Sequence, residues 1–166
     1  MSLKTQQIDL DALDLALLNH LQVDASESNQ ALAKRVHISA PTCLRRVKRL
    51  KDAGLIERQI AVLDPERVAS HMGHGLTAIV EITLDRQDQQ ALEAFEQRVA
   101  PDVAVQQCYR VSPGPDFILV VHASDMPAYL ALAQRLFTSD ANVRNVKAFF
   151  SVKRAKFEPR LPLTRK

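Results

Sequence analysis

The chain has 166 residues, 46% of them hydrophobic and only four of them glycine, so it is long enough for one folded domain or two small ones. It has no apolar run that could span a bilayer and no signal-peptide core, and we therefore expect no membrane partner. The net charge of +3 is unevenly distributed, since residues 1–63 carry +2, residues 64–147 carry −4 and residues 148–166 carry +5. The basic tail could contact nucleic acid or serve solubility alone.

The first helix is predicted over residues 11–22. Leucines recur there at helical spacing, at positions 10, 13, 17 and 21, with Leu18 widening the apolar stripe. Asp11 is a suitable N-cap, and Asp14 lies where the helix dipole favours a negative charge. A second, shorter helix is predicted over residues 29–36, with its apolar side chains facing inward.

A basic helix is predicted from Ser39 to Gly54. Ser39 is a good N-cap, Pro41 falls in the first turn, and Gly54 suits the residue that follows a helix. Apolar residues recur at helical spacing and are expected to be buried: Leu44, Val47 and Leu50. The residues between them are strongly basic: Arg45, Arg46, Lys48, Arg49 and Lys51.

Only residues 37–39 separate these two helices, and this arrangement is typical of a helix-turn-helix. Its second helix fits the major groove, where N-terminal side chains contact base edges and Arg and Lys neutralise phosphates. We therefore expect double-stranded DNA as a partner, with six candidate contacts: Ser39, Thr42, Arg45, Arg46, Lys48 and Arg49. Four of these are expected to face outward: Thr42, Arg45, Arg46 and Arg49. A surface helix with solvated charges is the alternative.

Residues 55–63 are β-prone and are predicted to form a wing or a connecting strand. With the preceding helices they would complete a winged helix-turn-helix domain over residues 1–63. The Asp64-Pro65 pair is expected to break the strand. Residues 64–75, with Pro65, Gly73 and Gly75, are predicted to be a linker or hinge.

Residues 76–166 are predicted to form a second domain with a basic C-terminal tail. Strands are expected at 76–84, 103–111, 117–122 and 143–153, and helices at 88–99 and 126–137. The order βαββαβ is that of a ferredoxin-like fold, so the fold class is α+β. Both helices would cover one face of the sheet, and we expect a second subunit to cover the other.

Several segments of the chain match one family in order. They are Leu10-Asp11 with Asp14, LAKRV, CLRRVKRL, AGLI, AVLDP, VEITL and the VS–DFILVV block. Through them the chain resembles the Lrp/AsnC (feast/famine) transcriptional regulators over nearly its whole length. The resemblance implies a winged helix-turn-helix followed by an amino-acid-sensing βαββαβ domain. It also implies homodimers, which often assemble further into tetramers or octamers.

The chain departs from the family pattern in three places. His37 stands where the turn of the helix-turn-helix usually has Gly, and His tolerates a positive φ better than most residues. The prolines near the start of the recognition helix are reduced to Pro41. The family's sensing loop begins with Gly where this chain has Pro113. Because Pro113 and Pro115 have no N–H, they cannot donate to an effector carboxylate.

By position, the resemblance assigns effector-responsive sites to Tyr109, Asp116, Met126, Phe149 and Phe150. It implies that a free amino acid binds where subunits meet, with its ammonium on Asp116 and its apolar side chain among the aromatic residues and Met126. Its carboxylate would need donors, which leaves the Ser112 hydroxyl and the N–H groups of Gly114, Asp116 and Phe117. Alternatively, the two phenylalanines only pack the dimer sheet and Asp116 only caps a turn.

Other functions have weaker sequence support. His71 and His74 have ligand-like spacing, but no third ligand is near, so we predict no metal site. We predict no enzyme and no cofactor, because the chain lacks a phosphate loop, a nucleophile elbow and paired catalytic acids. The cysteines, Cys43 and Cys108, are not paired in sequence, which predicts free thiols in a reducing, cytoplasmic compartment. The main rival is an amino-acid-binding or assembly module without effector-controlled DNA binding.

Overall fold

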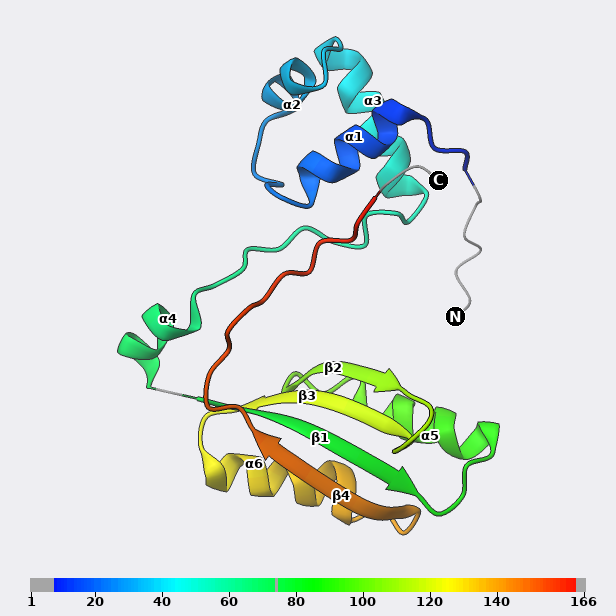
Figure 1. Cartoon of the computed structure of the whole chain (residues 1–166), viewed down its shortest axis with the longest axis vertical. Coiled ribbons are helices and arrows are strands. Elements are labelled where there is room, and N and C mark those ends of the chain that lie inside the picture. The colour runs from blue at the N-terminus through cyan, green and yellow to red at the C-terminus, as the bar shows by residue number, and fades with distance from the viewer. Residues whose placement is uncertain (1–7, 74, 164–166) are drawn as a thin grey trace. The chain divides into compact units, whose positions relative to one another are not determined.

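The computed structural model describes residues 8–73 and 75–163, which form two compact units (Figure 1). The N-terminal unit comprises the chain up to Val62 together with the chain from Phe157 on, and the C-terminal unit is Leu63–Lys156. Across the described part of the chain, no helix combines the length and apolar character that a membrane crossing requires. His74, one of the two histidines considered above as metal ligands, lies outside the described residues.

Three helices build the N-terminal unit: α1 (Ala12–Leu21), α2 (Asn29–Arg35) and α3 (Ala40–Asp52). The start of α1 is a capping box. The Asp11 carboxylate accepts a hydrogen bond from the Asp14 N–H at 2.9 Å, and the Asp14 carboxylate accepts one from the Asp11 N–H at 3.2 Å. Serine side chains cap the other two helices, Ser28 at α2 and Ser39 at α3. The three predicted helices are therefore confirmed to within one or two residues at each end.

The turn between α2 and α3 depends on one left-handed residue. His37 has a φ of 56°, the conformation that a glycine adopts most readily. The chain reverses there, and the Ile38 N–H donates to the carbonyl oxygen of Ala33 at 3.0 Å. The prediction that His37 permits this turn is confirmed.

The core of the N-terminal unit is small. Its buried hydrophobic residues are Leu17, Leu32, Ala33, Val36, Cys43, Val47 and Leu50. The prediction that Leu44 is buried was wrong, because 54% of this residue is exposed. At about 100° per helical residue, Cys43 lies in line with Val47 and Leu50, whereas Leu44 is turned by about 100° from it. Burial raises the pKa of the Cys43 thiol.

The strand or wing predicted over residues 55–63 was wrong. These residues form no strand in the described chain, and every residue from 57 to 63 is exposed, including Ile60 and Val62. The segment predicted to be a linker or hinge contains a helix, α4 (Pro65–Met72), which ends at Gly73, and its role as a linker stays a prediction. Asp64 caps α4 by accepting from the N–H groups of Glu66 and Arg67. The Asp-Pro pair thus begins a helix, because proline fits the first helical position.

The C-terminal unit has the predicted βαββαβ order. Its strands are β1 (Leu76–Leu84), β2 (Val105–Arg110), β3 (Phe117–Ala123) and β4 (Val143–Phe150). Its helices are α5 (Gln89–Val99) and α6 (Met126–Ala133), which continues as a π-helix, η1 (Gln134–Thr138). The strands pair antiparallel in the order β2-β3-β1-β4, so the predicted ferredoxin-like arrangement is confirmed.

The two faces of the sheet differ in chemistry. One face is packed against α5 and α6, and it contributes alternate residues of β1, from Ala78 to Leu84, to a core that includes Phe95 and Phe137. Strand register places a second set of side chains on the opposite, open face. Its hydrophobic members are Ile79, Tyr109, Ile118, Val120 and Phe149. Of these, Ile79, Tyr109 and Phe149 are more than two-fifths exposed.

The described part of the tail packs with the N-terminal unit, whereas the sequence placed it with the second domain. The Gln22 side-chain amide donates to the carbonyl oxygen of Leu161 and accepts from its N–H, both at 2.9 Å. Asn19 donates to the carbonyl oxygen of Leu163 at 3.3 Å. The side-chain amides of Asn19, in α1, and of Gln22, its C-cap, satisfy backbone groups of the tail that have no strand partner.

Candidate DNA-binding surface and effector site

Helix α3 presents one strip of exposed side chains. Pro41, Leu44, Arg45 and Lys48 are exposed and recur at helical spacing, on the side turned away from buried Cys43 and Val47. Lys48 forms an exposed ion pair with Asp52 one turn later, with 2.7 Å between Nζ and Oδ2. We call these four residues the α3 strip. It contains Arg45 and Lys48, two of the six DNA contacts predicted from the sequence.

The predicted contacts Ser39 and Thr42 hold the start of α3. Ser39 Oγ accepts from the Thr42 N–H at 3.4 Å, and the two hydroxyl oxygens lie 2.8 Å apart. The Ser39 hydroxyl therefore accepts from one of the free N–H groups in the first turn of α3, and the Thr42 hydroxyl lies against it. They remain at the end of α3 that a recognition helix directs toward base edges.

The last two predicted contacts, Arg46 and Arg49, both bind the Asp14 carboxylate of α1, but Arg49 keeps 44% of its side chain exposed, as the sequence predicted. Arg46 Nη1 is 2.7 Å from Asp11 Oδ2 and 2.9 Å from Asp14 Oδ1, and Arg49 Nη2 contacts Asp14 Oδ2. The Asp14 side chain is fully buried, whereas 22% of the Arg46 side chain is exposed. The expected outward orientation of Arg46 was therefore wrong, because Asp14 attracts it toward the helix interface.

The ion pairs between α1 and α3 also affect titration. The Asp14 N–H, followed by the Arg46 guanidinium, lowers the pKa of Asp11 from 3.8 to about 2. Hydrogen bonds to Asp11 and then to Asp14 raise the pKa of Arg46. We call Asp11, Asp14, Arg46 and Arg49 the α1–α3 ion cluster. It fixes the rotation of α3 about its own axis.

The predicted effector residues do not meet in a single copy of the chain. Asp116 directly precedes β3, and Met126 follows its other end. The seven residues of β3 therefore separate the two by about 20 Å, at about 3.3 Å per residue. Tyr109 and Phe149 lie on the open face of the sheet, whereas Phe150 lies on the helix face, with its ring centroid 5.0 Å from that of Tyr129.

Asp116 stabilises the turn between β2 and β3. Its Oδ2 accepts from the Leu84 N–H at 2.7 Å and from the Gln87 side chain at 3.3 Å. Its own N–H donates to the carbonyl oxygen of Ile82 at 2.9 Å. This N–H is therefore not free for an effector. The loop also contains exposed Ser112 and Gly114, whose φ of 124° suits only glycine.

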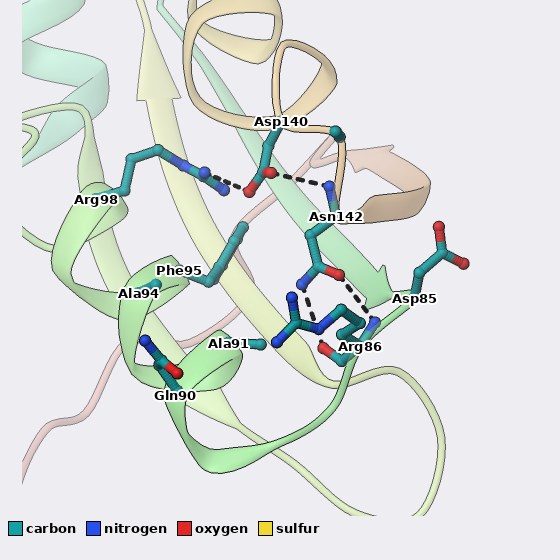
Figure 2. A pocket seen from close by; sticks show the side chains of 10 residues that line it. Asp85, Arg86, Gln90, Ala91, Ala94, Phe95, Arg98, Asp140 and Asn142 are labelled. Atoms are coloured by element: carbon teal, nitrogen blue, oxygen red, sulfur yellow. Dashed lines mark hydrogen bonds and ion pairs between the residues drawn. The ribbon is translucent and has the colours of Figure 1, made fainter.

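A pocket of about 600 Å³ opens between α5 and the segments 85–86 and 140–142 (Figure 2). Arg98 lies over the Phe95 ring, 5.1 Å from its centroid, and forms an ion pair with Asp140. In the described part of the chain, its Nε and Nη2 atoms are buried without a hydrogen-bond partner. Burial opposes ionisation of Asp140, but the Asn142 N–H and Arg98 outweigh it and lower the pKa of Asp140.

The pocket adjoins the Asp116 turn. The Asn142 side chain accepts a hydrogen bond from the Arg86 N–H at 2.8 Å and donates one to the Arg86 carbonyl oxygen at 3.2 Å (Figure 2). Asp116 contacts Leu84 and Gln87, which flank Asp85 and Arg86 in the chain. None of the effector residues predicted from the sequence lines the pocket. Sequence periodicity gave no signal for it, because its walls come from two segments, 85–98 and 140–142, that are distant in the chain.

Comparison with known proteins identifies both units. Residues 10–51 match the AsnC-type helix-turn-helix domain, and residues 77–161 match the Lrp/AsnC ligand binding domain. The chain belongs to the Lrp/AsnC family. It is therefore a transcriptional regulator with a helix-turn-helix DNA-binding domain and a ligand-binding domain.

Individual Lrp/AsnC relatives align with most of the chain. An uncharacterized HTH-type transcriptional regulator of Haemophilus influenzae is 37% identical, over 85% of this chain and 82% of that protein. A leucine-responsive regulatory protein of Rhizobium meliloti is 35% identical, over 90% of this chain and 94% of that protein. The similarity therefore extends through both units.

Solved Lrp/AsnC structures agree with the fold. An AsnC family transcriptional regulator from Agrobacterium tumefaciens has a TM-score of 0.80 at 31% identity, covering 92% of this chain and 97% of that one. A transcriptional regulator from Neisseria meningitidis, solved as a complex with L-Met, also has a TM-score of 0.80, at 30% identity over 93% and 97% of the two chains.

Proposed function

We propose that this regulator binds duplex DNA through the exposed side of α3 and that a free amino acid, bound by the C-terminal unit, controls this binding. The observation that carries the proposal is the presence of both family domains in one chain. The L-Met complex of the Neisseria meningitidis relative supports an amino acid as the class of effector. A DNA partner agrees with the cytoplasmic location that we expect from the unpaired cysteines, Cys43 and Cys108.

The DNA contact uses the α3 strip together with the start of the helix. Arg45 is exposed and can contact a base edge or a phosphate, and Lys48 can exchange Asp52 for a phosphate oxygen. Ser39 and Thr42 lie at the N-terminal end and complete the surface. Arg46 and Arg49 contribute mainly by holding α3 against α1.

The assembly we propose is a homodimer that covers the open face of the sheet, with further association into tetramers or octamers. The support is the exposure of Ile79, Tyr109 and Phe149 on a face that no described helix covers. A twofold dimer presents two α3 helices. It therefore fits a near-palindromic site whose half-sites lie one helical turn, or a multiple of it, apart.

The effector site requires more than one copy of the chain. Because β3 separates Asp116 from Met126, a site that uses both must take them from different protomers. The Asp116 side chain offers carboxylate oxygens to the ammonium of the amino acid, although Oδ2 already accepts two hydrogen bonds. The Asp116 N–H is engaged, and Phe117 is in the sheet, so Gly114 and Ser112 are the remaining local donors for a carboxylate.

Calorimetry with each of the twenty amino acids tests this function. The variant Asp116→Asn keeps the acceptor for Leu84 but removes the charge, so we expect it to weaken binding of the responsive amino acid by about tenfold or more. Asp85→Asn is the matched control, because Asp85 lies at the same end of the sheet and lines the pocket.

Two results would change the proposal. If Asp85→Asn abolished the binding heat while Asp116→Asn kept it, the effector site would be the pocket beside α5. An absence of heat with every amino acid, together with salt-sensitive DNA binding, would favour a regulator that no longer senses amino acids. A gel shift with duplex DNA, repeated at increasing salt, tests the DNA-binding part separately.

A further inference from the structure

Leu44 is the apolar member of an otherwise charged surface. It lies within the α3 strip, beside Arg45 and one turn before Lys48, and 54% of it is exposed. A single exposed leucine is common on protein surfaces and needs no explanation by itself. Its position is more informative, because it is the fifth residue of α3, in the part of a recognition helix that contacts base edges.

The packing of α3 keeps Leu44 at the surface. Rotating the helix to bury Leu44 would expose Cys43, which is fully buried. It would also separate Arg46 and Arg49 from the buried carboxylate of Asp14. The α1–α3 ion cluster therefore keeps an apolar side chain at the surface, outside the core of the N-terminal unit.

We propose that Leu44 contacts the C5-methyl group of a thymine at one fixed position in each half-site, and so determines specificity there. The inference rests on the proposed binding of DNA by α3. In the major groove, thymine presents a methyl group that apolar side chains contact, and no other base of unmodified DNA offers one. Arg45 and Lys48 flank Leu44 and supply the positive charge that brings α3 to the phosphates.

The test removes single methyl groups from the DNA. A duplex is first selected from a random library with the full chain, and each thymine of its half-sites is then replaced by deoxyuridine. One replacement should weaken binding about fourfold, the value expected for losing one buried methyl group at about 0.8 kcal/mol. The variant Leu44→Ala should bind the thymine and the deoxyuridine duplex equally well.

Matched variants separate this contact from general effects. Leu55→Ala removes an exposed leucine outside α3, in the N-terminal unit, and should keep the fourfold preference of the parent. Leu44→Gln should lose the preference for thymine, and renewed selection should favour adenine, since glutamine pairs with the adenine edge. Circular dichroism should show unchanged helix content in all three variants, because both leucines are exposed.

Four results would overturn the inference. If the parent protein bound the selected duplex with the same affinity after every thymine replacement, the thymine contact would be rejected, although DNA binding by the chain would stand. Equal discrimination by the parent and by Leu44→Ala would also reject it. A change in oligomer size with Leu44→Ala, without any change in base preference, would identify Leu44 as a contact between copies. If no duplex can be selected and binding has no salt dependence, the proposed function fails first, and the inference with it.

Discussion

The buried residues of the C-terminal unit are all hydrophobic within the described chain, whereas the N-terminal unit also buries the carboxylate of Asp14. The C-terminal core includes four aromatic side chains, namely Phe95, Phe117, Tyr129 and Phe137. The N-terminal core contains no aromatic residue and is smaller. The two units therefore reach a fixed structure by different means.

This difference concerns specificity of packing as well as stability. A large apolar core fills space in one way and can fix the positions of its helices alone. A small core of aliphatic residues constrains helix rotation less, and in the N-terminal unit the α1–α3 ion cluster supplies that constraint. A buried ion pair is weak evidence for stability, but it is costly to break because it leaves a charge without its partner.

The largest expected effect is in the aromatic core. Phe117 is fully buried and stacks on Phe95 with 4.6 Å between ring centroids. We expect Phe117→Ala to lower the free energy of unfolding of the C-terminal unit by about 3–5 kcal/mol. Tyrosine fluorescence in urea measures this unit alone, because both tyrosines, Tyr109 and Tyr129, lie within it. Leu130→Ala, at an exposed position, is the control and should change little.

Removing Asp14 tests the ion cluster. We expect Asp14→Ala to destabilise the N-terminal unit by about 1–3 kcal/mol, less than for a fully buried pair because both arginines reach solvent. It should also weaken DNA binding, because α3 loses its fixed rotation. Labelling of the buried Cys43 thiol measures opening of this unit. An unchanged labelling rate would mean that the apolar core alone holds α3, and exposed Asp9→Ala is the control.

A charge on the open sheet face tests whether association depends on the C-terminal unit. Phe149→Asp should raise the dimer dissociation constant by about tenfold or more, since it removes apolar burial and adds a charge to the interface. Light scattering across a concentration series measures the change. Leu130→Asp places the same charge on an exposed part of α6 and should leave assembly intact. A stable parent monomer at micromolar concentration would contradict the dimer.

The Asp11 carboxylate, which accepts from the Asp14 N–H and then from Arg46, should make the N-terminal unit sensitive to acid. The pKa of Asp11 is lowered in the folded chain from 3.8 to about 2, so the unfolded chain binds more protons between these values. Its contribution is present above pH 3.8 and is lost as the pH falls toward 2. Urea unfolding by circular dichroism should show less acid dependence in Asp11→Asn than in the parent. If the free energy of unfolding depended on pH equally in Asp11→Asn and in the parent, this prediction would be contradicted. The control is Asp9→Asn, at an exposed position.

The smallest expected effect concerns the turn. His37→Gly should relieve the left-handed backbone but should also increase the entropy of the unfolded chain, so the gain in stability should stay below about 1 kcal/mol. His37→Val should destabilise the unit, since a β-branched residue is strongly disfavoured at a φ of 56°. Thermal unfolding followed by helix circular dichroism measures both. Equal stability of the glycine and valine variants would show that the turn is not fixed at His37.

Short-range patterns predicted most of the fold. Hydrophobic periodicity gave the bounds of β1 and the βαββαβ order, and the capping residues Asp11 and Ser39 marked helix starts correctly. Errors arose where two local signals competed. Leu44 was predicted to be buried because it is hydrophobic and lies three residues before Val47, although Cys43 has the better helical phase with Val47 and Leu50. The Asp64-Pro65 pair signals both a chain break and a helix start.

The candidate sites were harder to predict, because they depend on contacts between distant residues. Nothing local indicates that Asp14 attracts Arg46 from 32 positions away, or that Asp116 holds the end of β1. The effector residues were assigned by resemblance, and β3 separates two of them in one chain. No pattern within a single sequence states how copies of a chain combine.

The bond between Gln22 and Leu161 has a consequence for the order in which the protein forms during synthesis. Helices α1, α2 and α3 leave the ribosome early, but the tail that packs on α1 is made only after the whole C-terminal unit. The N-terminal unit therefore receives these contacts only after the C-terminal unit has been made. A fragment that stops before residue 157 would contain all three helices and still lack these contacts, so its DNA affinity and stability should not be equated with those of the full chain.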